Sequence, residues 1–438
     1  MNQSSTKGIL QNLGWLSGEQ TFKMIIALPV SILVARYLGP DNVGILGYAV
    51  AMVGLFMPLA MTGLSGIVVR DLVKESSSTE ETLGSAFIVQ LCGSIVVMIL
   101  ALGVTVILQP NQWVTQLIVV IMAGKNIFTA FNVIDYWFQS KVQSKQVSSY
   151  RMIATLIVAG SKLILIWIQA SLLLFALVFI VESVIIALFL SLAYRKHVGS
   201  LRAWKASKAR VKELLYESWP LTISGLAIMV QAYVDQVMLG QMLGNNSVGQ
   251  YSVAIKLIGF VAFLPTIMQR SWAPSVAQAK REGQDAYLLR LSQLYQLMFG
   301  IFLLQGIPMF FLASPIVSVL YGAPFDEAGA LLSLLAIRLL FANYGLARNV
   351  YITNESMFVH SLLSAIAGSV VNVAANYLLI PIWGARGAII ATIISFTITV
   401  FVMDMLFAKT RENFFLMIRS PKLAISNGWR LIASRAAV

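Results

Sequence analysis

Eight ionisable side chains lie within long apolar stretches of this sequence, where a charge requires either a partner or a hydrated cavity. Five of them are cations: Lys23, Lys125, Lys162, Lys256 and Arg338. Three are acids: Glu19, Glu182 and Asp235. Each charge at membrane depth costs at least about 2.5 kcal/mol on insertion scales, so all eight are candidates for a functional site. The excess of cations suits a substrate that carries negative charge.

Amide and hydroxyl side chains share helix faces with several of these charges. Lys125, Thr129 and Asn132 are spaced i, i+4 and i+7, which places them on one stripe of a helix. Groups of this kind can replace water around a polar substrate, and if that substrate is a glycan we expect five of them to contact it: Thr129, Asn132, Gln231, Asn372 and Asn376. Polar stripes of this kind predict helices that surround a hydrated cleft.

The three acids are candidates for a coupling-ion site. A carboxylate in such a place can take up a proton, or bind sodium, as a transporter alternates between two states. Asp235 is the first choice, followed by Glu19 and then Glu182. Glu19 also stands four residues before Lys23, so a structural ion pair within one helix is an equal alternative to a transport role.

Other charges have simpler interpretations. Lys162 and Lys256 can extend toward a membrane surface while their aliphatic chains stay in lipid. Arg338 lies too near the centre of its apolar stretch for that, which favours a cavity. Asp135 and Asp404 fall near expected cytoplasmic helix ends, so we expect both to be solvated.

The composition is that of an integral membrane protein. Of the 438 residues, 58% are hydrophobic and 11% are charged, whereas soluble domains carry roughly 25% charged residues. A net charge of +13 would suggest nucleic acid in a soluble protein. Loops beside a membrane carry the same bias for reasons of orientation, so we expect the lipid bilayer and no nucleic acid as a partner.

Twelve stretches are apolar over the roughly 20 residues needed to cross a bilayer. They cover residues 13–37, 44–69, 83–108, 114–138, 150–169, 171–193, 217–239, 248–270, 291–313, 328–350, 358–380 and 385–407. The fold class is therefore an all-α integral membrane protein with twelve transmembrane helices in two six-helix lobes. The expected domains are an N-terminal lobe (1–193), a basic cytoplasmic linker (194–216), a C-terminal lobe (217–407) and a basic cytoplasmic tail (408–438).

The distribution of charge predicts the orientation. Of 31 Lys and Arg residues, 24 fall in segments that are cytoplasmic if the amino terminus is, and two fall in the opposite segments. This bias places both termini in the cytoplasm. The tail mixes large apolar residues with Arg and Lys, as an interfacial helix does, which predicts anchoring.

A turn in the first half returns in the second. The stretch ARYLGPDNVG at 35–44 has a counterpart, GQMLGNNSVG at 240–249, and their alignment pairs Gly39 with Gly244. Because the two turns are six helices apart, both halves have the same orientation in the membrane. Transporters with parallel halves bind their substrate between the halves, near the bilayer midplane.

Three stretches closely resemble signatures of the polysaccharide-transporter branch of the MOP superfamily, the Wzx-type flippases: LVARYLGPDNVGILGYAVAM, DQVMLGQMLGNNSVGQYSVAIKL and NYLLIPIWGARGAIIATIISF. The resemblance implies a MATE-like fold. It implies translocation of undecaprenyl-pyrophosphate-linked oligosaccharide repeat units of O-antigen, lipopolysaccharide or capsule across the bacterial inner membrane, by alternating access coupled to H⁺ or Na⁺. It also implies other polysaccharide assembly proteins, such as the polymerase, as partners.

Three alternatives remain open at this point. A multidrug or cation antiporter of the same superfamily should carry an excess of acids in its cavity, and here cations prevail. A flippase for the peptidoglycan precursor usually has fourteen helices. A membrane glycosyltransferase should show a large outer loop with catalytic acids, and the sequence has none. Two histidines, His197 and His360, are too few and too distant in sequence for a metal pair, so we expect neither a metal nor another cofactor.

Overall fold

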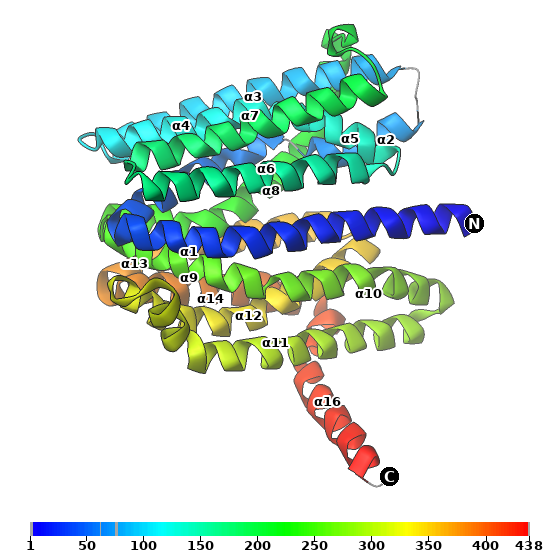
Figure 1. Cartoon of the computed structure of the whole chain (residues 1–438). Helices are drawn as coiled ribbons and strands as arrows, with labels where there is room; N and C mark the ends of the chain where they lie inside the picture. The colour runs from blue at the N-terminus through cyan, green and yellow to red at the C-terminus, as the bar shows by residue number, and fades with distance from the viewer. Residues whose placement is uncertain (1–2, 62, 75–77, 437–438) are drawn as a thin grey trace. The chain divides into compact units, whose positions relative to one another are not determined.

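Figure 1 shows the computed structural model of the chain, in which helices joined by short turns make up the described residues. The structure describes the backbone of residues 3–61, 63–74 and 78–436, and the side chains of residues 12, 14–61, 63–74 and 78–426. Within these ranges no strand occurs, as expected for a chain that must satisfy its backbone hydrogen bonds inside a bilayer. The expected all-α fold class is confirmed.

Contacts divide the chain into two compact units, Met1–Val237 and Met238–Val438. The helices of the first unit are α1 (Gln3–Met61), α2 (Leu64–Lys74), α3 (Thr79–Leu108), α4 (Trp113–Thr129), α5 (Val133–Ser140), α6 (Ser144–Trp167), α7 (Leu172–His197) and most of α8 (Lys208–Met242). Those of the second are α9 (Asn245–Val261), α10 (Phe263–Glu282), α11 (Gln284–Tyr321), α12 (Asp326–Asn354), α13 (Phe358–Trp383), α14 (Ala385–Thr397), α15 (Met403–Leu406) and α16 (Arg411–Ala436). The division falls inside α8, so the lobe boundaries expected at 193 and 217 stay predictions.

Eleven stretches of the described residues are long and apolar enough to cross a membrane. The first, Gly14–Lys74, has 61 residues. A straight helix of that length would measure about 90 Å, three times the hydrocarbon thickness. It is broken at Gly39, whose backbone is not helical, and counting it as two spans gives the expected twelve. The orientation of the termini stays a prediction, and the side chains of Lys7, Arg430 and Arg435, which contribute to it, lie outside the described residues.

The two turns of the repeat have the same backbone geometry. Gly39 has φ 74° and ψ 170°, and Gly244 has φ 86° and ψ −177°. This region of φ/ψ space is essentially restricted to glycine, because a Cβ would clash with the neighbouring backbone. Both glycines stand just before a new helix, so each marks the point where one helical segment ends and the next begins. The sequence match therefore reflects a shared structural requirement.

Replacing Gly39 or Gly244 by alanine is expected to lower the free energy of unfolding by about 1–3 kcal/mol, the usual cost of a disfavoured backbone conformation. Apart from the adjoining residues of the chain, a methyl group at either position would meet no atom within 4 Å, so the cost comes from the local backbone alone. Gly160 lies in the middle of α6 with the same open space around it, and Gly160→Ala should be neutral or stabilising. Thermal unfolding in detergent micelles compares the three variants, and equal stability of all three would contradict the argument.

Two apolar clusters hold the helices of the first unit together. The larger joins α2, α3, α5, α7 and the start of α6 through residues such as Leu64, Phe138 and Leu190. A smaller cluster of Leu38, Ala170 and Phe175 joins the end of the first span to the turn between α6 and α7. The two clusters lie near opposite ends of α6 and α7, which leaves the middle of these helices free to carry polar groups.

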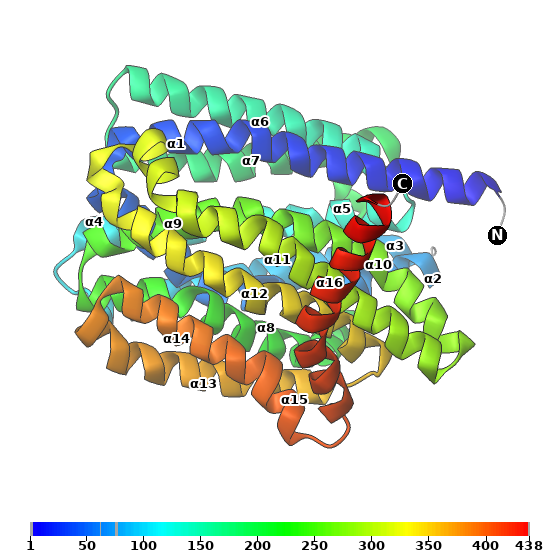
Figure 2. The same ribbon diagram turned by 90° about the horizontal axis from the view of Figure 1, so that it is seen from below.

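In the second unit, α16 departs from the direction of the other helices and crosses them (Figure 2). Asn413, Met417 and Ser420 are fully buried on one face of α16, which packs against α11. Ile418 and Ile425 are exposed on its other side. The tail is thus a helix docked on its own unit, and its anchoring in the membrane interface stays a prediction.

Candidate functional site

Two of the five expected cavity cations converge on one aromatic ring in the first unit. The Nζ of Lys125, from α4, lies 5.4 Å from the ring centroid of Phe179, and the Nζ of Lys162, from α6, lies 5.0 Å from it. Phe179 belongs to α7 and is half-buried. Both distances are within the range of cation–π attraction, which holds the two ammonium groups close without neutralising them.

Two more charges of the predicted set belong to this cluster. Lys125 interacts electrostatically with Glu182, Lys23 and Lys162, and Lys162 interacts with Glu182 and Lys23. Glu182 follows Phe179 by about one turn of α7, and Lys23 comes from α1. Three cations and one carboxylate give the group a net charge of +2. We call Lys23, Lys125, Lys162 and Glu182 the cationic cluster.

The cationic cluster lies between the two apolar clusters of its unit. Along α7, Phe175 belongs to the smaller apolar cluster, Glu182 comes next, and Leu190 belongs to the larger one. Charges at this depth are expensive unless an anion or water accompanies them. Lys162 contacts Phe179, and the cavity interpretation of this lysine stays a prediction.

Glu19 lies in a different group of charges. Its Oε1 is 3.9 Å from Nη1 of Arg151, and Nη2 of Arg151 donates to Oδ2 of Asp135 at 3.0 Å. Among the described residues, Glu19 therefore forms an ion pair with Arg151 of α6. The expected ion pair between Glu19 and Lys23 is not found among the described residues. Asp135 is only 5% exposed, so the expectation that it is solvated is wrong. The carboxylate turns inward because Arg151 and Gln139 donate to it.

The polar stripe of α4 is distorted at its end. α4 ends at Thr129, whose hydroxyl donates to the carbonyl of Asn126 at 2.7 Å. Asn132 lies in the 3₁₀ turn (Ala130–Asn132) that comes next. Thr129 and Asn132 are both half-buried, but the tighter turn moves Asn132 off the ideal stripe of Lys125. The expected glycan contacts of Thr129 and Asn132 stay predictions.

The remaining expected site residues of the first unit lie in α8. Asp235 is 2% exposed and Gln231 is 9% exposed, and each interacts with other groups of the protein. Asp235 is thus buried and engaged, as a coupling residue or a structural residue would be. Its coupling role stays a prediction.

In the second unit the expected residues come from three helices, α9, α12 and α13. The guanidinium carbon of Arg338 lies 5.3 Å from the ring centroid of Phe396, and Lys256 is exposed on α9. Asn372 and Asn376 are fully buried in α13. A glycan would reach these two amides only after the packing of α13 changes, so their expected contact role stays a prediction.

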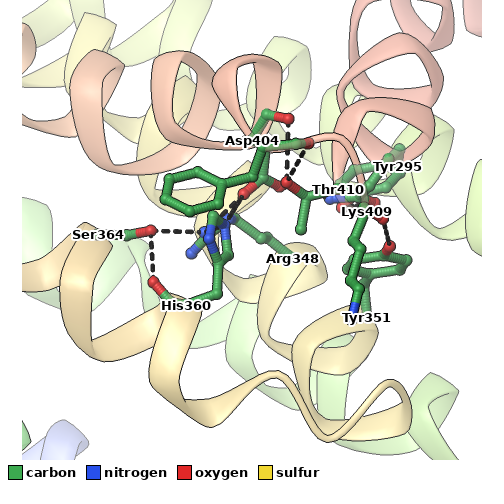
Figure 3. A network of polar contacts seen from close by, with 10 residues as sticks. Tyr295, Arg348, Tyr351, His360, Ser364, Asp404, Lys409 and Thr410 are labelled. Atoms are coloured by element: carbon green, nitrogen blue, oxygen red, sulfur yellow. Dashed lines mark hydrogen bonds and ion pairs between the residues drawn. The ribbon is translucent and has the colours of Figure 1, made fainter.

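A buried charge network in the second unit was not expected from the sequence (Figure 3). Arg348 of α12 donates from Nη2 and Nε to Oδ1 of Asp404 at 2.6 and 2.9 Å. The Nε2 of His360 lies 2.8 Å from the same oxygen. Asp404 is fully buried, and the expectation that it is solvated is wrong. Arg348 is one of the 24 cations expected in cytoplasmic segments, and it is 5% exposed.

Further helices contribute to the network around Asp404. The Nδ2 of Asn413, on α16, donates to Oδ2 of Asp404 at 2.8 Å, and the hydroxyl of Tyr295, on α11, donates to Asn413 at 2.8 Å. Five residues in a π-helical turn (Ile398–Val402) immediately precede α15. The extra residue of such a turn rotates the helix after it by about 100°, which brings Asp404 round to Arg348. π turns of this kind recur at functional sites.

Comparison with known proteins identifies the family of the chain. Residues 9–280 match the sequence profile of a family described as "Polysaccharide biosynthesis protein". A curated relative, the "Probable flippase AglR" of Haloferax volcanii, is 25% identical over 228 residues. That match covers 50% of this chain and 46% of the relative, so the chain spans about half the length of the relative it matches.

Solved structures of MOP superfamily transporters share the fold. An inward-facing MATE multidrug transporter has a TM-score of 0.68 at 16% identity, over 91% of this chain and 96% of that one. The lipid II flippase MurJ, in an inward closed conformation, has a TM-score of 0.69 at 13% identity, over 94% and 91%. A Pyrococcus furiosus transporter described as having a binding pocket of reversed polarity has a TM-score of 0.63 at 15% identity, over 93% and 96%. The expected MATE-like fold is confirmed.

Proposed function

The chain belongs to the polysaccharide biosynthesis protein family, a family of transporters rather than enzymes, and on that premise we propose that it is a flippase for lipid-linked glycans. The substrate we propose is an undecaprenyl-pyrophosphate-linked oligosaccharide, the repeat unit of O-antigen or capsule. The protein moves it from the inner to the outer leaflet of a bacterial inner membrane, with both of its own termini in the cytoplasm. The family match and the flippase relative support the general class of activity.

The observation that carries the proposal is the cationic cluster. A pyrophosphate that leaves the headgroup region needs cations to replace the water and counterions it gives up. The ammonium groups of Lys125 and Lys162 lie on one ring, and both lysines come from apolar stretches long enough to span a bilayer. A net charge of +2 is equal in magnitude and opposite in sign to the charge of a pyrophosphate diester. The same balance disfavours a carrier of organic cations, which would need acids in excess.

Lys125→Ala and Lys162→Ala are each expected to slow translocation about ten- to hundredfold, since hydrogen bonds to charged groups contribute about 1.5–3 kcal/mol and 1.4 kcal/mol corresponds to a factor of ten. Purified protein is reconstituted into liposomes that contain polyprenyl-pyrophosphate-linked oligosaccharide. A glycosidase added outside then measures how fast the glycan reaches the outer leaflet.

Lys196→Ala is the matched control, because Lys196 is exposed at the end of α7, the helix that carries Phe179. It removes the same charge without touching the cluster, and its rate should equal that of the wild type. If wild-type protein moves no glycan in this assay, the proposed substrate is wrong. If the two cluster variants retain full rates, the cluster is not its site.

A further inference from the structure

The helix α16 carries polar residues on its inner face and large apolar residues on its outer face. On the inner face, the hydroxyl of Tyr295 donates to Oδ1 of Asn413 at 2.8 Å, and the hydroxyls of Tyr344 and Ser420 lie 2.7 Å apart. The outer face holds four large apolar residues that are 40–54% exposed: Phe415, Ile418, Leu423 and Ile425. This is the reverse of a surface helix in a soluble protein, which turns its apolar stripe inward.

Basic side chains share the outer face of α16. Four residues spaced i, i+3, i+7 and i+10 occupy one stripe of the helix: Phe415, Ile418, Lys422 and Ile425. The guanidinium carbon of Arg419 lies 5.9 Å from the ring centroid of Phe415, beside this stripe. In the part of α16 whose side chains are described, the exposed ionisable residues are three cations and one acid: Arg411, Arg419, Lys422 and Glu412. The outer face is therefore both apolar and positively charged.

The contacts of α16 place it across the other helices of its unit, near one of their ends. Figure 2 shows this crossing. The contacts are made by Tyr295, 11 residues after the start of α11, and by Tyr344, 10 residues before the end of α12. These two helix ends lie together, because Gln284 and Glu355 line the same cavity. At 1.5 Å per residue, α16 crosses both helices about 15–17 Å from these ends.

This position corresponds to the boundary between hydrocarbon and water. α11 has 38 residues and so measures about 57 Å, whereas the hydrocarbon core of a bilayer is about 30 Å thick. About 27 Å of α11 must therefore stand outside the hydrocarbon, divided between its two ends. A crossing about 15–17 Å from one end lies where α11 leaves the hydrocarbon.

We propose that the outer face of α16 binds the acidic headgroups of membrane phospholipids, with its apolar side chains among the first carbons of the acyl chains. Water alone does not suit this face, because clustered large apolar groups are unfavourable there. The hydrocarbon interior does not suit it either, because charges are expensive at that depth. The boundary accommodates both, and the positive charge favours acidic over neutral lipids. The inference is independent of the proposed flippase function.

A fluorescent label on the full chain measures the depth of this face. The native Cys92 is replaced by serine, and Ile418→Cys carries an environment-sensitive fluorophore. The protein is reconstituted into phosphatidylcholine vesicles with or without phosphatidylglycerol, and a water-soluble quencher is present on both sides. We expect the acidic lipid to protect the label at least fivefold, since each basic side chain near an acidic surface contributes roughly a factor of five. A label at Asp285→Cys, exposed at the start of α11, should be quenched equally in both lipids.

A triple variant tests the basic side chains directly. Arg411→Gln combined with Arg419→Gln and Lys422→Gln removes the positive charges of the outer face and keeps its apolar residues, so the label at residue 418 should lose its dependence on acidic lipid. The matched control neutralises three exposed cations of the first unit: Arg195→Gln, Lys196→Gln and Lys208→Gln. This control should keep the full dependence, and thermal unfolding verifies that both triple variants are folded.

Three results would overturn the proposal. The first is a label at residue 418 that is fully quenched in acidic vesicles, which would place the outer face in water and leave it for a protein partner. The second is equal protection in neutral and acidic vesicles, which would mean that apolar contact alone holds the helix. The third is an unchanged lipid dependence in the triple variant of α16, which would assign the effect to charges elsewhere in the chain.

Discussion

Asp404→Ala is expected to cause the largest loss of stability of any single substitution considered for this chain, about 3–5 kcal/mol, because it leaves the guanidinium of Arg348 buried without its carboxylate. Arg348 is 5% exposed and makes two of its hydrogen bonds to Oδ1 of Asp404. The same change removes the acceptor of His360 and of Asn413. Thermal unfolding in micelles, combined with chemical denaturation, measures the loss.

A double-mutant cycle distinguishes a buried unpaired charge from a simple cavity. Asp404→Leu combined with Arg348→Met removes both charges, and we expect the double variant to be more stable than either single variant. Glu355→Ala is the control, because it removes an ion pair that is more exposed to water: Glu355 and Lys280 are each about one-third exposed. We expect this variant to lose no more than about 1 kcal/mol of unfolding free energy. Strictly additive losses across the cycle would contradict the network.

Hydropathy was sufficient to predict the spans because each one must satisfy the same length and polarity requirement independently of its neighbours. The expected break at residues 169–171 lies between the end of α6 at Trp167 and the start of α7 at Leu172. The turn at Gly39 was predictable for a similar local reason, because only glycine suits its backbone. Helix ends depended on turn chemistry that the sequence displays directly.

The network around Asp404 was not predictable in this way. Arg348, His360 and Asp404 stand near ends of their spans, where the default expectation is contact with water. Their sequence separations follow no helical period, since they come from three helices. The π turn that rotates Asp404 inward has no recognised sequence signal in the stretch ITVFV. Only the three-dimensional packing reveals that these three polar groups share one buried place.

The cationic cluster is an intermediate case. Hydropathy alone indicated that Lys125 and Lys162 are buried, and the helical period indicated that they face inward. Neither of these patterns indicated that both lysines approach Phe179, an ordinary aromatic residue in an apolar run. Glu182 was predicted as a coupling acid, yet the structure places it among the lysines. Its charge is therefore part of the net charge of the cationic cluster, which on our proposal faces the substrate.

Lys125→Glu is expected to reduce translocation more than a hundredfold, because it lowers the net charge of the cationic cluster from +2 to zero and places a carboxylate against the substrate phosphate. The lost hydrogen bond and the new repulsion together exceed about 3 kcal/mol, which corresponds to a factor of more than a hundred. The outer-leaflet glycosidase assay measures the rate, and thermal unfolding confirms that the variant is folded.

The charge-swapped variant Lys125→Glu with Glu182→Lys separates charge from position. It returns the cluster to +2 with the same four residue positions, and the two exchanged groups are already electrostatic neighbours across α4 and α7. If the cluster acts through its net field on a pyrophosphate, the swap should recover at least a tenth of the wild-type rate. Recovery no better than that of Lys125→Glu would mean that the ammonium of Lys125 acts from one required position. An unimpaired Lys125→Glu variant would remove the cluster from the transport path altogether, since no anion crosses a low-dielectric region beside an uncompensated carboxylate without a large energetic cost.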